Sequence, residues 1–182
     1  MILPFHTNES ALIVIDVQGR LAYLMHRHEH LFKHLKIMIK AAKVLDIPIF
    51  YLEQYPQGLG HTNDEIKAEL ADLVAYEKIT FSSCGQTQFI EDLKNSGRQQ
   101  MIISGIETHV CVYQTVLDLL AEKFQVAVNQ DAVSSRTKAN KKLGIHRMEQ
   151  AGAVITSTEM VLFEMMQTAK HPRFKEISNL LK

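Results

Sequence analysis

Residues 11–15 read Ala-Leu-Ile-Val-Ile, and Asp16, Val17 and Gln18 follow them directly. A run of this length is too short for a helix, and its branched side chains are typical of a strand buried on both faces of a sheet. Similar runs return at 48–52, 100–104, 126–128 and 153–155, and a weaker candidate lies at 73–76. The pattern therefore predicts a sheet of about six strands.

Helical periodicity fills the gaps between these runs. Apolar residues recur at helical spacing at 31–45, 87–94, 112–120 and 139–150, and 159–182 predicts one or two helices with a break at 171–172. Strands that alternate with helices favour an α/β protein with a parallel sheet covered on both faces. No linker or repeat is visible, so residues 1–182 are expected to form a single domain.

Charge and composition exclude several kinds of partner. The chain has 20 Lys plus Arg against 20 Asp plus Glu and no long basic run, so no nucleic-acid partner is expected. Neither a signal peptide nor a membrane-spanning run is visible, so no membrane partner is expected. Two cysteines, Cys84 and Cys111, fit a reducing compartment and hence a cytoplasmic location. The expected partner is a small-molecule substrate.

The methionines bear on assembly. The chain has 8 of them, including Met160, Met165 and Met166 near its C-terminal end. Flexible thioether side chains make adaptable apolar surfaces, and the sequence therefore predicts a homo-oligomer.

Three titratable residues follow three of the predicted strands. Asp16 comes after the first strand, Lys78 after the weak third one, and Cys111 follows Gly105 and Thr108 after the fourth. Ligands of parallel sheets sit outside the carboxyl ends of the strands, where these side chains are expected. Thr108 predicts a helix N-cap, which would place Cys111 in a first turn that favours a thiolate. Such a trio could activate a thiol, with Asp16 as base and Lys78 as electrostatic partner.

Each residue also has a plainer interpretation. Asp16 could cap the next helix, Lys78 could be a solvated loop lysine, and Cys111 could be a small buried hydrophobe. Cys84, beside Ser82 and Ser83, is expected to be a packed bystander.

Four segments together resemble the isochorismatase-like cysteine hydrolases. They are Ala11 to Gln18, Lys78 to Ser82, Gly105 to Val112, and Asp131 to Ser135. The resemblance implies a Rossmann-like three-layer α/β/α fold and a catalytic triad of Asp16, Lys78 and Cys111. It also implies a non-proline cis peptide at Ile106-Glu107, and an oxyanion hole formed by the backbone N–H groups of Glu107 and Cys111.

The chain departs from the nicotinamidases of that family, which hold a metal through an Asp-x-His motif after the second strand. Here Glu53-Gln54-Tyr55-Pro56 stands at that place, so neither a metal nor another cofactor is expected. The retained Cys111 favours cleavage of a small amide or related C–N bond through a thioester. Two alternatives stay open, namely hydrolysis of an isochorismate-type vinyl ether, in which Cys111 is dispensable, and a non-catalytic oligomeric scaffold.

Further candidates surround this site. Gln18, Tyr55, Phe81 and Tyr113 are candidate pocket residues, because pockets for small planar substrates often have aromatic walls. His26, His28, His30 and His34 cluster near the first predicted helix, and His30 with His34 has the spacing of a helical metal pair. Without an acidic partner motif, a polar helix face is the better interpretation of these histidines.

Overall fold

A computed structural model describes residues 4–182. Its sheet contains six parallel strands in the order β3-β2-β1-β4-β5-β6. The strands are β1 (Ser10–Ile15), β2 (Ile49–Gln54), β3 (Tyr76–Lys78), β4 (Gln100–Ile106), β5 (Gln125–Ser134) and β6 (Val154–Thr156). The expected parallel α/β sheet is confirmed, although β3 begins only at Tyr76, the last residue of the run that predicted it.

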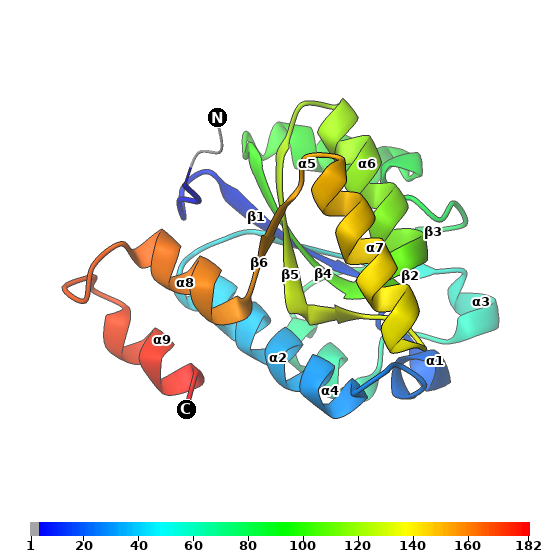
Figure 1. Ribbon diagram of the computed structural model, residues 1–182, viewed down its shortest axis with the longest axis horizontal. Coiled ribbons are helices and arrows are strands. Elements are labelled where there is room, and N and C mark those ends of the chain that lie inside the picture. Colours follow the sequence, from blue (N-terminus) through cyan, green and yellow to red (C-terminus); the bar gives the residue numbers. More distant parts are fainter. Residues whose placement is uncertain (1–3) are drawn as a thin grey trace.

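Helices cover both faces of the sheet and complete the three-layer fold (Figure 1). One face carries α2 (His28–Val44), α8 (Thr158–Met166) and α9 (Phe174–Leu180), and the other carries α5 (Thr87–Asn95), α6 (Tyr113–Ala121) and α7 (Lys138–Gln150). The sequence pattern did not predict three short helices, namely α1 (Gly19–Tyr23), α3 (Pro56–Leu59) and α4 (Asp64–Lys67). These three are too short to carry an apolar period.

The alternation of side chains along β1 divides the core. Leu12 and Val14 pack in the apolar cluster under α2, whereas Ile13 and Ile15 pack in the opposite cluster, under α6. All of them are almost fully buried. Because a parallel strand has helices on both faces, its sequence reads as a continuous apolar run rather than an alternating one.

Close contact between β1 and β4 depends on Gly105. Its φ is +120°, and a Cβ at this position would lie 2.1 Å from the carbonyl oxygen of Ile15. Only glycine combines this backbone conformation with so close an approach. The two central strands thus end side by side.

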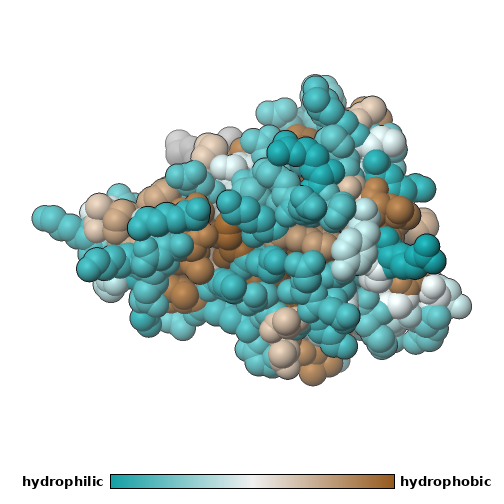
Figure 2. All heavy atoms as spheres, turned by 90° about the horizontal axis from the view of Figure 1, so that it is seen from below, coloured by the Kyte–Doolittle hydropathy of each residue, from teal (hydrophilic) through white to brown (hydrophobic). Residues whose placement is uncertain are grey.

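Hydrophilic residues cover most of the face shown in Figure 2, and hydrophobic ones form separate areas between them. Met165 and Met166, which we expected at an apolar surface, are buried in the core cluster under α2. These two side chains provide apolar packing inside the protein rather than an oligomer surface, because α8 turns them toward the core, whereas Met160 is exposed. Within residues 4–182, no helix is long and apolar enough to cross a membrane.

Candidate active site

The three titratable residues lie at the carboxyl ends of their strands. Asp16 follows β1, Lys78 is the last residue of β3, and Cys111 lies in the turn after β4. The strand order reverses between β1 and β4, because β2 and β3 lie on one side of β1 while β4 to β6 lie on the other. Such a switch point is where open parallel sheets bind their ligands.

A buried ion pair joins Lys78 to Asp16. The ammonium of Lys78 lies 2.7 Å from Oδ2 of Asp16, and the exposed fractions of the two side chains are 0% and 5%. Lys78 also donates to Oε1 of Gln54 at 2.6 Å and to the carbonyl oxygens of Thr80 and Phe81 at 3.3 and 3.1 Å. Lys78 is therefore not a solvated loop lysine, because its ammonium group is buried and donates hydrogen bonds to oxygen atoms of the protein.

Asp16 is held in a left-handed conformation, with φ of +54°. Its N–H donates to the carbonyl of Leu52 at 3.1 Å, which ties the turn after β1 to β2. Among the described residues the carboxylate does not cap α1, since Gln18 is the residue at the cap position and Asp16 Oδ2 accepts from Lys78. The second oxygen, Oδ1, is buried without a hydrogen-bond partner among the described residues, and the thiol of Cys111 is near enough to influence the carboxyl group.

Cys111 lies in an unusual turn. Residues Thr108–Val112 form a π-helical turn (η3) that leads into α6, and the Ile106-Glu107 peptide is cis. The carbonyl of Glu107 accepts hydrogen bonds from the N–H groups of Val110 and Val112, on either side of Cys111, at 3.0 and 3.3 Å. Turns of this kind are frequent at functional sites.

The predicted N-cap at Thr108 is wrong. Glu107 precedes the helical turn, and Thr108 is its first residue. The Thr108 hydroxyl oxygen is buried and has no hydrogen-bond partner within residues 4–182. The helical turn starts one residue earlier than the preference of threonine for caps suggests, because Glu107 has the extended backbone of a cap residue, with φ of −81° and ψ of 139°.

Burial governs the ionisation of the trio. Burial, followed by the negative charge of Asp16, raises the pKa of Cys111 to about 12 even though Lys78 acts in the opposite direction. Burial also raises the pKa of Asp16, against the lowering effect of Lys78. We expected the helix start to favour a thiolate, but the unliganded protein holds a thiol beside a carboxyl group of increased basicity. Proton transfer between them would therefore accompany attack by sulfur.

The four candidate pocket residues occupy different environments. Gln18 is fully buried, and its amide donates to the carbonyls of Gln54 and Gly60 at 3.0 and 2.6 Å while its oxygen accepts from the Gln54 N–H at 2.6 Å. It braces the ends of β1 and β2. Tyr55 and Phe81 are 50% and 54% exposed and follow the ends of β2 and β3. Tyr113 donates no hydrogen bond that reaches the trio, and its hydroxyl accepts from Arg147 at 2.9 Å.

Sequence reasoning missed Gln54. Its oxygen receives a hydrogen bond from Lys78, and its amide donates to the carbonyl of Ile79 at 2.6 Å. Gln54 is opposite Lys78 in the β2–β3 register, and its strand lies between the strands that carry Lys78 and Asp16. A signal was present, because Gln54 is a polar residue at the end of an apolar run, as Asp16 is.

Glu53 holds the segment that follows β2 through contacts with His61 and Thr62. Its carboxylate accepts from the N–H and hydroxyl of Thr62 at 2.6 and 2.7 Å and lies 2.8 Å from Nδ1 of His61. Burial on its own would raise the pKa of Glu53, but these hydrogen bonds outweigh it and the pKa is lowered. Within residues 4–182, no group of three or more His, Cys, Asp or Glu side chains is placed to hold a metal ion.

The remaining candidates lie elsewhere. Cys84 is half-buried in a 3₁₀ turn beside α5, and burial followed by the charge of Asp118 raises its pKa to about 12. His30 and His34 stack with ring centroids 4.1 Å apart, and Nδ1 of His34 is hydrogen-bonded to the carbonyl of His30 at 2.8 Å. This contact fits a polar helix face.

Comparisons with known proteins agree on one family. The model of the isochorismatase domain matches residues 10–160. The chain is 36% identical to "Isochorismatase family protein 1A" of Dictyostelium discoideum, covering 93% of this chain and 84% of that protein. It is 37% identical to "Secreted isochorismatase effector Isc1" of Phytophthora sojae, covering 96% and 85%.

A solved structure extends the similarity to three dimensions. The structure described as a MAR1 ribonuclease from Caenorhabditis elegans superposes with a TM-score of 0.93 at 37% identity, covering 98% of this chain and 92% of that one. The β-sheet and the helical layers are therefore common to both proteins.

Proposed function

The chain belongs to the isochorismatase family, a family of hydrolases, and from that premise we propose that it is a cysteine hydrolase that cleaves a small amide or related C–N bond. The observation that carries the proposal is the buried ion pair of Asp16 and Lys78 at the switch point of the sheet, with the thiol of Cys111 near enough to influence the pKa of Asp16. A thiol, a base and a fixed cation at one place are the parts that nucleophilic catalysis needs. The proposed reaction needs no metal ion.

Attack begins on a carbonyl carbon of the substrate. Sγ of Cys111 forms the C–S bond while its proton passes to Asp16, and the carbonyl electron pair moves onto oxygen. The N–H groups of Glu107 and Cys111 are the proposed donors to this oxyanion. When the oxyanion collapses, the C–N bond breaks and Asp16 returns the proton to the leaving nitrogen.

The second half of the reaction uses the same groups. Asp16 takes a proton from water while the water oxygen attacks the thioester. The C–S bond then breaks to release the acid, and Asp16 returns the proton to Sγ and restores the thiol. Lys78 keeps its charge throughout and stabilises the carboxylate form of Asp16. Tyr55 and Phe81 are the exposed aromatic residues nearest in sequence to this machinery and are proposed to contact the substrate.

The test compares the two cysteines. Cys111→Ala should reduce the release of amine from a panel of small amides by about a thousandfold or more, whereas Cys84→Ala should leave it near wild type. Mass spectrometry of the wild type during turnover of a slow substrate should show an acyl group on Cys111. Full activity of Cys111→Ala would contradict the thiol mechanism.

One alternative is hydrolysis of an isochorismate-type vinyl ether. The raised pKa of Asp16 favours it, because a higher pKa increases the share of the carboxyl group that carries a proton and can protonate the vinyl carbon. On isochorismate, Asp16→Asn would then abolish turnover while Cys111→Ala would retain it. Loss of turnover in both variants would instead support the thioester mechanism.

RNA hydrolysis is a second alternative, and it is favoured by the name of the nematode structure. The equal numbers of acidic and basic residues argue against a polyanionic substrate. Incubation of the wild type and Asp16→Asn with end-labelled RNA would distinguish the two. Cleavage by the wild type that is lost in the variant would establish a ribonuclease.

Assembly and location complete the proposal. A homo-oligomer and a cytoplasmic location remain predictions, and light scattering and cell fractionation would test them. The relative from Phytophthora sojae is named as secreted, so location can differ within the family. If the protein turns over none of these substrates, the non-catalytic scaffold becomes the better interpretation.

A further inference from the structure

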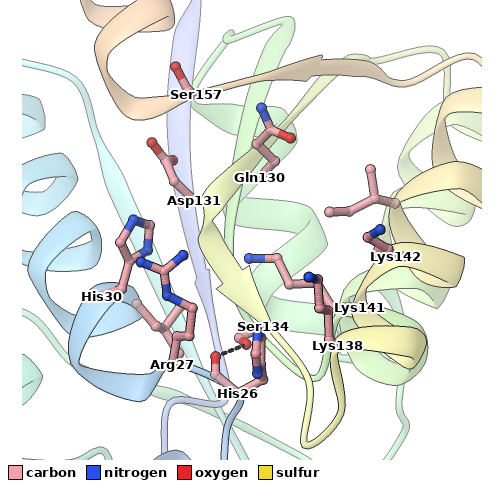
Figure 3. A pocket seen from close by; sticks show the side chains of 12 residues that line it. His26, Arg27, His30, Gln130, Asp131, Ser134, Lys138, Lys141, Lys142 and Ser157 are labelled. Atoms are coloured by element: carbon pink, nitrogen blue, oxygen red, sulfur yellow. Dashed lines mark hydrogen bonds between the residues drawn. The ribbon is translucent and has the colours of Figure 1, made fainter.

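A cavity of about 370 Å³ lies between α2 and α7, beside the open edge of β5. It exists because β6 is short. Thr156, the last residue of β6, pairs with Asn129, whereas β5 continues to Ser134 without a neighbouring strand on that side among residues 4–182. Figure 3 shows side chains from the start of α2 and from α7 facing one another across β5.

Positive charge dominates the lining. Its cationic side chains are Arg27, Lys138, Lys141 and Lys142, with His26 and His30 beside them. Within residues 4–182, none of the four cationic side chains forms a hydrogen bond or an ion pair. This is a concentration of unpaired cations in a chain whose total charge is zero.

Of the described residues that line the cavity, only Asp131 carries a carboxylate, and it already accepts hydrogen bonds from the protein. Asp131 accepts from the N–H of Thr158 with both oxygens at 3.0 Å and from the Thr158 hydroxyl at 2.9 Å, at the start of α8. Its Oδ2 also lies 3.8 Å from Nε2 of His34. The N-terminal end of α8 and the side chain of His34 therefore already interact with the single negative charge of Asp131, which leaves less of that charge to balance the lysines.

The positive charges that line the cavity contribute to lowering the pKa values of their neighbours. Burial, opposed by Asp131 and assisted by Arg27, lowers the pKa of Lys141. Burial, followed by the charges of His34, Arg27 and Lys141, lowers the pKa of His30. An anion placed between these groups would relieve this repulsion.

We propose that this cavity binds the phosphate group of a small molecule, either inorganic phosphate or a phosphate monoester. A phosphate dianion matches several converging cations, and the planar fork of Arg27 suits two of its oxygens at once. The volume of about 370 Å³ lies in the range of small-molecule pockets, which accommodates a phosphate with a small organic group. The site goes beyond the hydrolase proposal, since it uses neither Asp16 nor Lys78 nor Cys111.

A small ligand is favoured over a nucleic acid. Binding of a polyanion requires a basic surface that extends over many phosphates, and this chain has no excess of basic residues to form one. Here the unpaired cations converge on one cavity.

The experiment is titration of the full chain with inorganic phosphate and with phenyl phosphate, at ionic strength held constant with sodium chloride. We expect saturable binding at one site per chain. Lys141→Gln and Arg27→Gln should each weaken binding about tenfold. The matched control is Lys175→Gln, an exposed lysine on α9, which should bind like the wild type.

Two further measurements separate the outcomes. Circular dichroism of each variant verifies folding, and phosphate binding should persist in Cys111→Ala, so failure of the hydrolase proposal would not affect this one. Absence of saturable binding, or equal affinity of Lys141→Gln and the wild type, would overturn the site. Tenfold tighter binding of single-stranded RNA than of phenyl phosphate, with displacement of phosphate, would overturn a small-molecule ligand in favour of nucleic acid.

Discussion

The ammonium of Lys78 lies 2.7 Å from Oδ2 of Asp16, although β2 separates the strands that carry them. Lys78 reaches Asp16 across the end of β2, where the Gln54 oxygen accepts its second hydrogen bond at 2.6 Å. Three adjacent strands are thus joined by one buried cation. The same contact holds the proposed base in place and makes its charge compatible with burial.

Removal of Lys78 should therefore destabilise the protein. In Lys78→Met the carboxylate of Asp16 remains buried without its counter-charge, which typically costs about 3–5 kcal/mol. Urea unfolding at neutral pH would measure the loss. The matched control is the double variant Lys78→Met/Asp16→Asn, which should recover part of the stability because no unpaired charge remains. Equal stability of the single variant and the wild type would show that the pair is not buried as described.

Removal of the Asp16 charge should make the thiol of Cys111 more reactive toward an alkylating reagent, although it should lower catalytic turnover. Burial and then the charge of Asp16 raise the pKa of Cys111 to about 12. Asp16→Asn removes the second cause, so iodoacetamide should alkylate Cys111 several times faster at pH 8 while amide turnover falls. Cys84→Ser provides the background in which only this thiol reacts.

Cys84 supplies the control for that experiment. Its pKa is also raised to about 12, by burial and by Asp118 rather than by Asp16. In a Cys111→Ser background, Asp16→Asn should leave alkylation of Cys84 unchanged. If Asp16→Asn also left the alkylation rate of Cys111 unchanged, the result would mean that Asp16 does not influence the thiol.

The sequence predicts the sheet better than it predicts the site. The central strands could be recognised because burial on both faces leaves a run of apolar residues in each, Ala11 to Ile15 in β1 and Met101 to Ile103 in β4. β3 is short, lies at the edge and has only Lys78 buried, so its apolar signal lies upstream of the strand itself.

The contacts of the site depend on side chains that meet only in the folded protein. Asp16, Lys78 and Cys111 could be nominated because each follows a predicted strand, but spacing does not reveal that Lys78 crosses β2 to reach Asp16. Gln54 was missed for the same reason. The depth of burial, which keeps Cys111 protonated, also follows from packing and not from its place near a helix start.

Gly105 should tolerate no larger residue. Gly105→Ala would place a Cβ 2.1 Å from the Ile15 carbonyl, in a backbone conformation with φ of +120°. Thermal or urea unfolding should show a loss of more than about 3 kcal/mol, because the two central strands must separate. Gly97→Ala is the matched control, since φ is +71° there but no atom lies within 4 Å of the added carbon. Its loss should be only about 1 kcal/mol. Similar losses in the two variants would contradict the close approach of β1 and β4.

Glu53 should make stability depend on pH. Its hydrogen bonds from Thr62 and His61 lower its pKa in the folded protein despite burial. A carboxyl group whose pKa is lowered by folding stabilises the protein above its unfolded pKa, and this contribution is lost as the pH falls through the folded pKa. Glu53→Gln should therefore cost about 1.5–3 kcal/mol at pH 7, and the difference from the wild type should shrink below pH 4. Urea unfolding at several pH values measures this difference in stability. The control is Glu77→Gln, at an exposed position of β3. A difference that stays constant between pH 7 and pH 3 would show that the charge of Glu53 does not hold the His61–Thr62 segment.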